Sequence, residues 1–166
     1  AADLPIGKSD EPSIARVEEI FKDYLGGQPL LTNNSRWVNF RAFRNATWAH
    51  ENLVILGDAA HTAHFAIGSG TKLAMEGSIS LAACLLEHRD VAKALAAYDQ
   101  ERRPVVESTQ RSAQAALEWF EEITQYVDQD PIQFAFNLLT RSRRITYGNL
   151  RERDPQFMER VDVWFL

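Results

Sequence analysis

The spacing of apolar residues near the start of the chain predicts a helix. Residues 13–25 place apolar side chains three and four positions apart, with Ser13 as the N-cap and Gly26-Gly27 as the stop. The apolar positions of this segment are Ile14, Val17, Ile20, Phe21 and Tyr24. We therefore expect a helix over these residues.

Two segments in the middle of the chain have the pattern of strands. Apolar and polar residues alternate over residues 36–43, which is typical of a half-buried strand. Residues 53–57 form a short continuous apolar run, which predicts a fully buried strand with parallel neighbours. The run ends in Gly57 and Asp58, so Asp58 would lie at the carboxyl end of a strand, where ligands bind in open α/β sheets.

The second half of the chain reads as helical. A buried helix of about five turns is predicted over residues 70–88, and Asp90 would cap the next one. Pro104 ends or kinks that helix, or occupies the first turn of a new one. A further short helix should begin after Asp130, whereas residues 143–166 are rich in arginine and aromatic residues with weak periodicity.

The predicted order, two or three strands followed by a long helical run, contains too few strands for a stable sheet. Two strands do not form a stable sheet alone, and the chain supplies no parallel neighbours for residues 53–57. We infer a fragment, or a chain that pairs with a partner, and expect its exposed apolar surface to favour self-association, for instance as a homodimer. The expected division is into two parts: residues 1–50, the end of a preceding region with a linking strand, and residues 51–166, which include the helical tail.

Composition excludes several classes of protein. The chain has 166 residues, 45% hydrophobic and 25% charged, and a net charge of −5, so no general basic field favours nucleic acid. Its single cysteine, Cys84, lies in an apolar run and is expected to be a buried, inert thiol. No signal peptide or membrane-spanning run is visible, which leads us to expect a cytoplasmic protein.

Most candidate ligand-binding residues lie within residues 54–77, and three functions of this segment are considered: a metal site, a phosphate site and a cofactor cleft. A metal could bind Asp58, His61 and His64, but no further ligand follows at a suitable spacing. The glycines of residues 68–70 could cradle a phosphate at a helix N-terminus, although the order of a P-loop is absent. The alternative to a phosphate site is an ordinary turn between strand and helix that has no function. The third function considered is a cofactor cleft.

The third function explains all parts of the segment at once. The sequence "GDAAH", a glycine-bearing loop and the helix together resemble the second flavin-binding motif of the FAD-dependent aromatic hydroxylases. The later "YDQERRPVV" resembles the tyrosine-to-arginine-proline stretch that follows this motif in the family. The resemblance implies an α/β FAD-binding monooxygenase fold, present here as a mostly helical carboxyl-terminal part. It implies contacts to FAD from a set of loop residues. These are Gly57, Asp58, Ala59, Gly68, Ser69, Gly70 and Thr71, with Ala60 and His61 in the same motif.

Within that family the chain looks most like the hydroxylases of salicylyl-CoA and 2-aminobenzoyl-CoA, and more distantly like the tryptophan hydroxylase of violacein synthesis. The segments that carry this likeness are "HTAHFAIGSGTKLAMEG" and "FAFNLLTRSRRITYGNLRERDP". The family's Gly-x-Gly-x-x-Gly unit, which holds the ADP half of FAD, does not occur in the chain. The resemblance therefore implies that an N-terminal part of the same protein completes the site.

The resemblance also implies an activity and roles for side chains. The family uses NADH or NADPH and O2 to hydroxylate an aromatic substrate on the flavin. His64, Phe65 and Ile67 would wall the substrate pocket, and His61 and His64 are the candidates for a catalytic base. Arg143 and Arg144 of the arginine-rich tail could bind a CoA phosphate, although a solvated face is the favoured interpretation. A non-catalytic helical interaction module that retains this sequence is the alternative function.

Overall fold

The computed structural model describes residues 8–35 and 37–165, and the chain divides into two compact units at Phe40–Arg41. In the first unit, α1 (Glu11–Leu25) is followed by an extended segment that returns along it. Trp37 Nε1 donates to Ser13 Oγ at 2.7 Å, and the backbone N–H of Leu30 donates to Glu18 at 2.8 Å. The helix is confirmed, but its N-cap is Asp10 rather than Ser13, whose hydroxyl donates to the Asp10 carboxylate.

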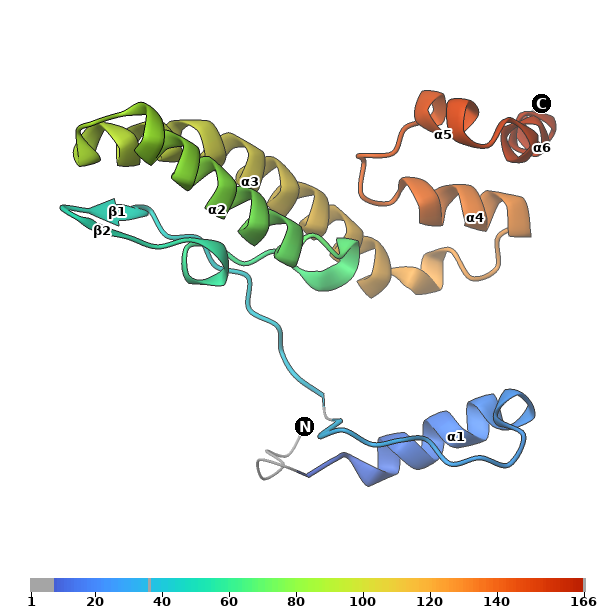
Figure 1. Ribbon diagram of the computed structural model, residues 1–166. Coiled ribbons are helices and arrows are strands. Elements are labelled where there is room, and N and C mark those ends of the chain that lie inside the picture. Colours follow the sequence, from blue (N-terminus) through green and yellow to red (C-terminus); the bar gives the residue numbers. More distant parts are fainter. Residues whose placement is uncertain (1–7, 36, 166) are drawn as a thin grey trace. The chain divides into compact units, whose positions relative to one another are not determined.

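The second unit is mostly helical and carries a two-stranded antiparallel sheet, β1 (Ala49–His50) with β2 (Leu53–Val54). Short 3-10 helices follow as η1 (Gly57–Ala59) and η2 (Phe65–Ile67), and then the long helices α2 (Gly70–Glu87) and α3 (Val91–Glu121) lie side by side (Figure 1). The remaining elements are η3 (Ile123–Gln125), α4 (Pro131–Thr140), α5 (Tyr147–Arg153) and α6 (Pro155–Phe165).

Both strand predictions need correction. Residues 37–43 form no strand, and Arg36 lies outside the described residues; only Arg44 makes an isolated bridge, to His61. The apolar run at residues 53–57 is not a buried parallel strand, since only two of its residues pair, and they pair antiparallel with β1. The side chain of Leu53 is 70% exposed. Within the described part of the chain no further strand offers the hydrogen bonds that a longer strand needs.

The helices agree better with expectation, although α2 is not buried on most sides as predicted, since Ile79 and Leu86 are 71% and 89% exposed. The carboxylates of Asp90 and Asp130 accept from the backbone N–H groups of Lys93 and Ile132 and so cap α3 and α4 as predicted. Pro104, however, does not end a helix, since α3 runs through it. The buried face of α3 packs along α2, and this packing compensates for the hydrogen bond that a proline cannot donate.

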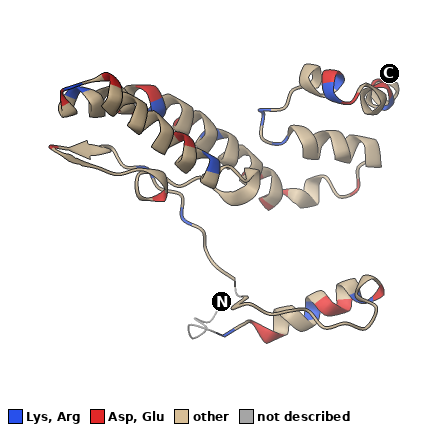
Figure 2. Ribbon diagram, viewed as in Figure 1, with Lys and Arg blue, Asp and Glu red and all other residues tan. Residues whose placement is uncertain are grey.

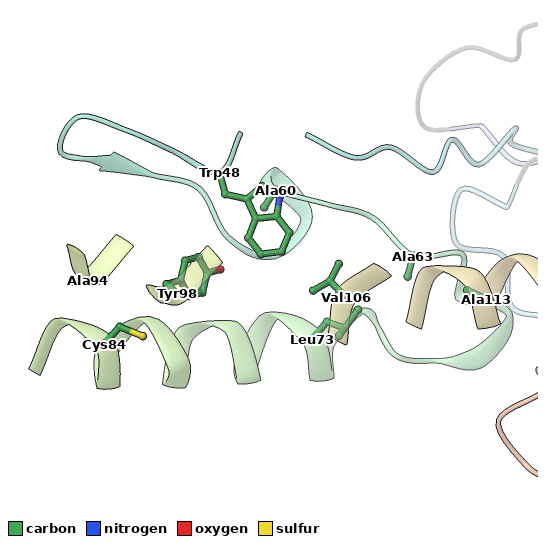
Figure 3. Close-up of a cluster of buried hydrophobic side chains, with 9 residues drawn as sticks. All are labelled: Trp48, Ala60, Ala63, Leu73, Cys84, Ala94, Tyr98, Val106 and Ala113. Carbon is green, nitrogen blue, oxygen red and sulfur yellow. The ribbon is translucent and has the colours of Figure 1, made fainter. Parts of the chain in front are cut away.

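Two apolar clusters hold the second unit together. The larger one joins α2 and α3 to the loop around Trp48 and Ala60, with Tyr98 and Val106 almost completely buried (Figure 3). Cys84 is buried there, and burial raises the pKa of its thiol, as expected for an inert cysteine. The smaller cluster joins α4, α5 and α6 around Leu150, Met158 and Val161.

The arginine-rich tail is more regular than its sequence indicated. A capping box between Thr146 and Asn149 begins α5, and Pro155 occupies the first turn of α6. Figure 2 shows that α4 carries no charged side chain, while α5 carries arginines. In the described part of the chain no helix is long and apolar enough to cross a membrane.

Candidate cofactor site

The β1–β2 hairpin leads directly into Gly57, where the chain turns against α2. Gly57 has a φ of 57°, and a Cβ built on it would lie 3.2 Å from Ala74 Cβ of α2. A side chain there would be strained and would also press on the helix. Glycine therefore lets η1 approach α2 closely, which places Asp58 beside the helix that follows the loop.

Asp58 is exposed within η1. Its carboxylate makes no hydrogen bond or ion pair with another residue among those described. The backbone around it is nonetheless held firmly, because Asn45 Nδ2 donates to the carbonyl of Ala59 at 2.7 Å and to that of Ala60 at 3.1 Å. A fixed carboxylate that faces outward is an acceptor ready for hydroxyl donors of a ligand.

His61 lies on the opposite, buried side of this turn. The side chain is 4% exposed, and its ring centroid is 5.2 Å from that of Trp48. The backbone N–H of His61 donates to the Gly57 carbonyl. Burial lowers the pKa of His61; Asp58 raises it in part, and Arg102 lowers it further. The neutral, enclosed ring fits a packing role better than that of a base in contact with substrate.

His64 shapes the loop that leads to α2. Its Nδ1 accepts from the backbone N–H of Ala66 at 3.2 Å and so caps η2, and its ring lies 4.2 Å from that of Phe65. Phe65 is 70% exposed, whereas Ile67 packs against the larger cluster. Of the three residues expected to wall a pocket, only Phe65 presents most of its surface outward.

The start of α2 is open. Ser69 is the N-cap, but its hydroxyl donates back to Ile67 and does not cap the helix. A Cβ built on Gly68 or on Gly70 meets nothing within 4 Å. Lys72 pairs with Glu76 at 3.2 Å, so the backbone N–H groups of this turn are what an incoming anion would meet. An outward carboxylate and an open helix N-terminus suit a ligand that carries both hydroxyls and phosphates.

One important residue was missed by sequence reasoning. Gln110 of α3 is buried, and its Nε2 donates to the carbonyl of Thr62 at 2.7 Å and to that of Phe43 at 3.2 Å. It thereby ties the loop and the preceding extended segment to α3. The available signal was a glutamine within the stripe of buried positions of α3, where an apolar residue would be expected.

A cavity of about 280 Å³ lies beside the loop. It is lined by Ala42, Phe43, Arg44, Thr62, Ala63, His64, Gln110 and Gln114. His64 is the one residue of the predicted pocket wall that contributes to it, and Arg143 and Arg144 do not. Arg144 Nη1 instead donates to Thr109 Oγ1 of α3 at 3.3 Å, and Arg143 is exposed. Among the described residues no three His, Cys, Asp or Glu side chains group as a metal site would require.

Comparisons with known proteins agree on one family. A family model described as "FAD binding domain" matches residues 5–113. The chain is 48% identical over 165 residues to salicyloyl-CoA 5-hydroxylase of a Streptomyces species, a match that covers 98% of this chain and 32% of that protein. It is 42% identical over 139 residues to 3-hydroxy-4-methyl-anthranilyl-[aryl-carrier protein] 5-monooxygenase of Streptosporangium sibiricum, covering 84% of this chain and 39% of that protein.

A more distant relative is protodeoxyviolaceinate monooxygenase of Chromobacterium violaceum, 28% identical over 138 residues, which covers 82% of this chain and 37% of that protein. The chain therefore spans about a third of the length of these curated relatives. The matches extend from the first unit through the loop and the helices, so the likeness is not confined to a short motif.

Proposed function

The chain belongs to the FAD binding domain family, and from this premise we propose that it is the carboxyl-terminal segment of a flavin-dependent aromatic monooxygenase. FAD is the cofactor, NADH or NADPH is its reductant, and O2 is the source of the added oxygen. A preceding part of the same protein would complete the α/β fold and hold the ADP half of FAD. In this proposal residues 1–50 end the substrate region and residues 51–166 belong to the cofactor domain.

The residues present fit one side of an FAD site. The outward carboxylate of Asp58 accepts hydrogen bonds from the cofactor's hydroxyls, and Gly57 and Ala59 hold it at that place. The open N-terminus of α2, from Ser69 to Thr71, attracts negative charge on the cofactor. Bound FAD supplies the redox chemistry, and these residues supply position and electric field.

The names of the relatives bear on the substrate. One acts on salicyloyl-CoA and another on an anthranilyl group carried by an aryl-carrier protein. Both names describe an aromatic acyl group on a carrier, so we infer an aromatic acyl substrate of this kind for the longer protein. Phe65 and His64 would border its ring, with Ile67 fixing the loop from the apolar cluster. Both tail arginines are exposed, and Arg143 is the better of the two for a carrier phosphate because Arg144 donates to Thr109.

The observation that carries the proposal is Asp58, an exposed carboxylate that makes no hydrogen bond or ion pair among the described residues, beside an open helix start. The match to an FAD-binding domain over residues 5–113 favours a monooxygenase over a non-catalytic helical module.

The test is the FAD affinity of the longer protein that contains this chain. A hydrogen bond to a charged acceptor contributes about 1.5–3 kcal/mol, so Asp58→Ala should weaken FAD binding by about ten- to a hundredfold or slightly more. Asp128→Ala, which removes an exposed carboxylate elsewhere, is the matched control and should retain FAD. Equal FAD affinity in the two variants would refute the role of Asp58.

A further inference from the structure

Arg141 connects the helical tail to the loop of the candidate site. It is the residue that follows α4, and its side chain is half-buried. Its Nη1 donates to the carbonyl of Leu138 at 2.6 Å, and its Nη2 donates to the carbonyl of Ala66 at 3.1 Å. Its guanidinium also lies 5.1 Å from the ring centroid of Phe120 at the end of α3. A single side chain thus touches α4, α3 and η2.

Ala66 is the middle residue of η2, and side chains hold both of its backbone polar groups. His64 Nδ1 accepts from its N–H at 3.2 Å, and Arg141 donates to its carbonyl. At the beginning of the same loop, Gln110 donates to the carbonyl of Thr62 at 2.7 Å. The loop between the buried turn at His61 and the start of α2 is therefore tied to α3 at one end and to the tail at the other.

The loop needs such ties because it has little regular structure of its own. Between the buried turn and α2 it forms one 3-10 turn followed by Gly68, whose backbone is little restricted. An arginine suits the task, because its planar fork reaches two carbonyls at once while its face packs on an aromatic ring. A lysine, with one ammonium group, does not reproduce this geometry.

On the basis of the proposed function, we propose that Arg141 is a positioning residue for FAD: it fixes η2 and, through it, the adjoining turn at residues 68–70, which that function sets against the cofactor, and so makes the tail part of the cofactor site. This role differs from the two expectations for the tail arginines, a solvated face or a carrier phosphate. Arg141 acts through the backbone of Ala66 and does not itself touch cofactor or substrate.

The experiment compares Arg141→Ala and Arg141→Lys with the unsubstituted longer protein. Arg153→Ala, at the exposed end of α5, is the matched control. Three quantities are measured: hydrogen–deuterium exchange of the amides of residues 62–70 without FAD, the dissociation constant of FAD, and the hydrogen peroxide released per NAD(P)H oxidised. We expect Arg141→Ala to speed exchange in the loop and to weaken FAD binding by about tenfold, with more peroxide released.

A positioning role also predicts which changes restore function. Arg141→Lys should behave like Arg141→Ala, and millimolar guanidinium should restore FAD affinity to Arg141→Ala but not to the lysine variant. A merely structural role would instead lower the thermal midpoint, and guanidinium would not help. Two results would overturn the inference. In the first, Arg141→Ala shows the same loop exchange and the same FAD affinity as the Arg153→Ala control. In the second, guanidinium does not restore the FAD affinity of Arg141→Ala. An unsubstituted protein that fails to bind FAD would instead contradict the proposed function, while the exchange rates would still report on the loop.

Discussion

At the scale of single residues, one short turn separates two kinds of polar group. Asp58 is exposed and makes no hydrogen bond or ion pair among the described residues, and His61, three positions later, is enclosed against Trp48. The sequence indicated both residues as candidates, but it could not indicate which of them would be buried. Their difference depends on Trp48 and Arg102, which approach from other parts of the chain. Similarly, Gln110 and Arg141 bond to carbonyls 48 and 75 positions away, contacts that no local pattern predicts.

The buried state of His61 makes stability depend on pH. Burial, with help from Arg102 and opposed by Asp58, lowers its pKa below the ordinary 6.5. Just below that value the unfolded chain binds a proton that the folded chain does not, so the free energy of unfolding falls as the solution becomes more acidic. The contribution of the buried, neutral His61 to stability is therefore complete above pH 6.5, and it is lost as the pH falls towards the lower pKa of the folded state.

We therefore expect His61→Gln to reduce the loss of stability between about pH 7.5 and pH 5.5, as measured by urea unfolding of the chain. His50→Gln is the matched control, because His50 is exposed on β1, and it should keep the full loss. The same pH dependence in His61→Gln and in the unsubstituted chain would show that another group is responsible.

At the scale of elements, helices were predictable where local signals coincide. Asp90 and Asp130 precede apolar helical repeats, and both cap helices in the structure. The strands were not predictable, because a strand is completed by a ladder of backbone hydrogen bonds from another segment. Residues 37–43 have no such ladder, and the bonds at Phe43 come from Thr62 and from the side chain of Gln110. Nor could sequence reveal that α3 continues through Pro104, since packing along α2 decides this. The short helices α5 and α6 were not predicted from the sequence, because a small apolar cluster that they share stabilises them, and neither has a long helical repeat of apolar residues.

The close approach of η1 to α2 gives a test of packing. Gly57 and Gly68 both have positive φ, 57° and 62°, but only Gly57 has a neighbour in the way of a side chain. Gly57→Ala should lower the free energy of unfolding by about 1–3 kcal/mol more than Gly68→Ala, because only the first forces Ala74 to move. Urea denaturation of both variants measures the difference. Equal losses would mean that backbone strain alone, and not the contact with α2, requires glycine at position 57.

At the scale of the whole molecule, the chain exposes apolar side chains on α2 and on the hairpin. Met75, Ile79 and Leu86 lie on one face of α2 and are 64%, 71% and 89% exposed. Leu53 of the hairpin is exposed as well. Together with the match to about a third of its relatives' length, this surface supports the proposal that a preceding part of the same protein packs here. The same surface explains why the isolated chain is expected to self-associate.

The central claim is that the chain holds one side of an FAD site. One side alone should bind FAD poorly, because the cost of ordering the ligand is then met by fewer contacts. The most direct measurement is the absorbance between about 350 and 500 nm, where flavin absorbs, after excess FAD is added and removed by desalting. The chain alone should be colourless, and the chain produced with the preceding part of its protein should retain stoichiometric FAD. Yellow colour in both samples, or in neither, would contradict the claim.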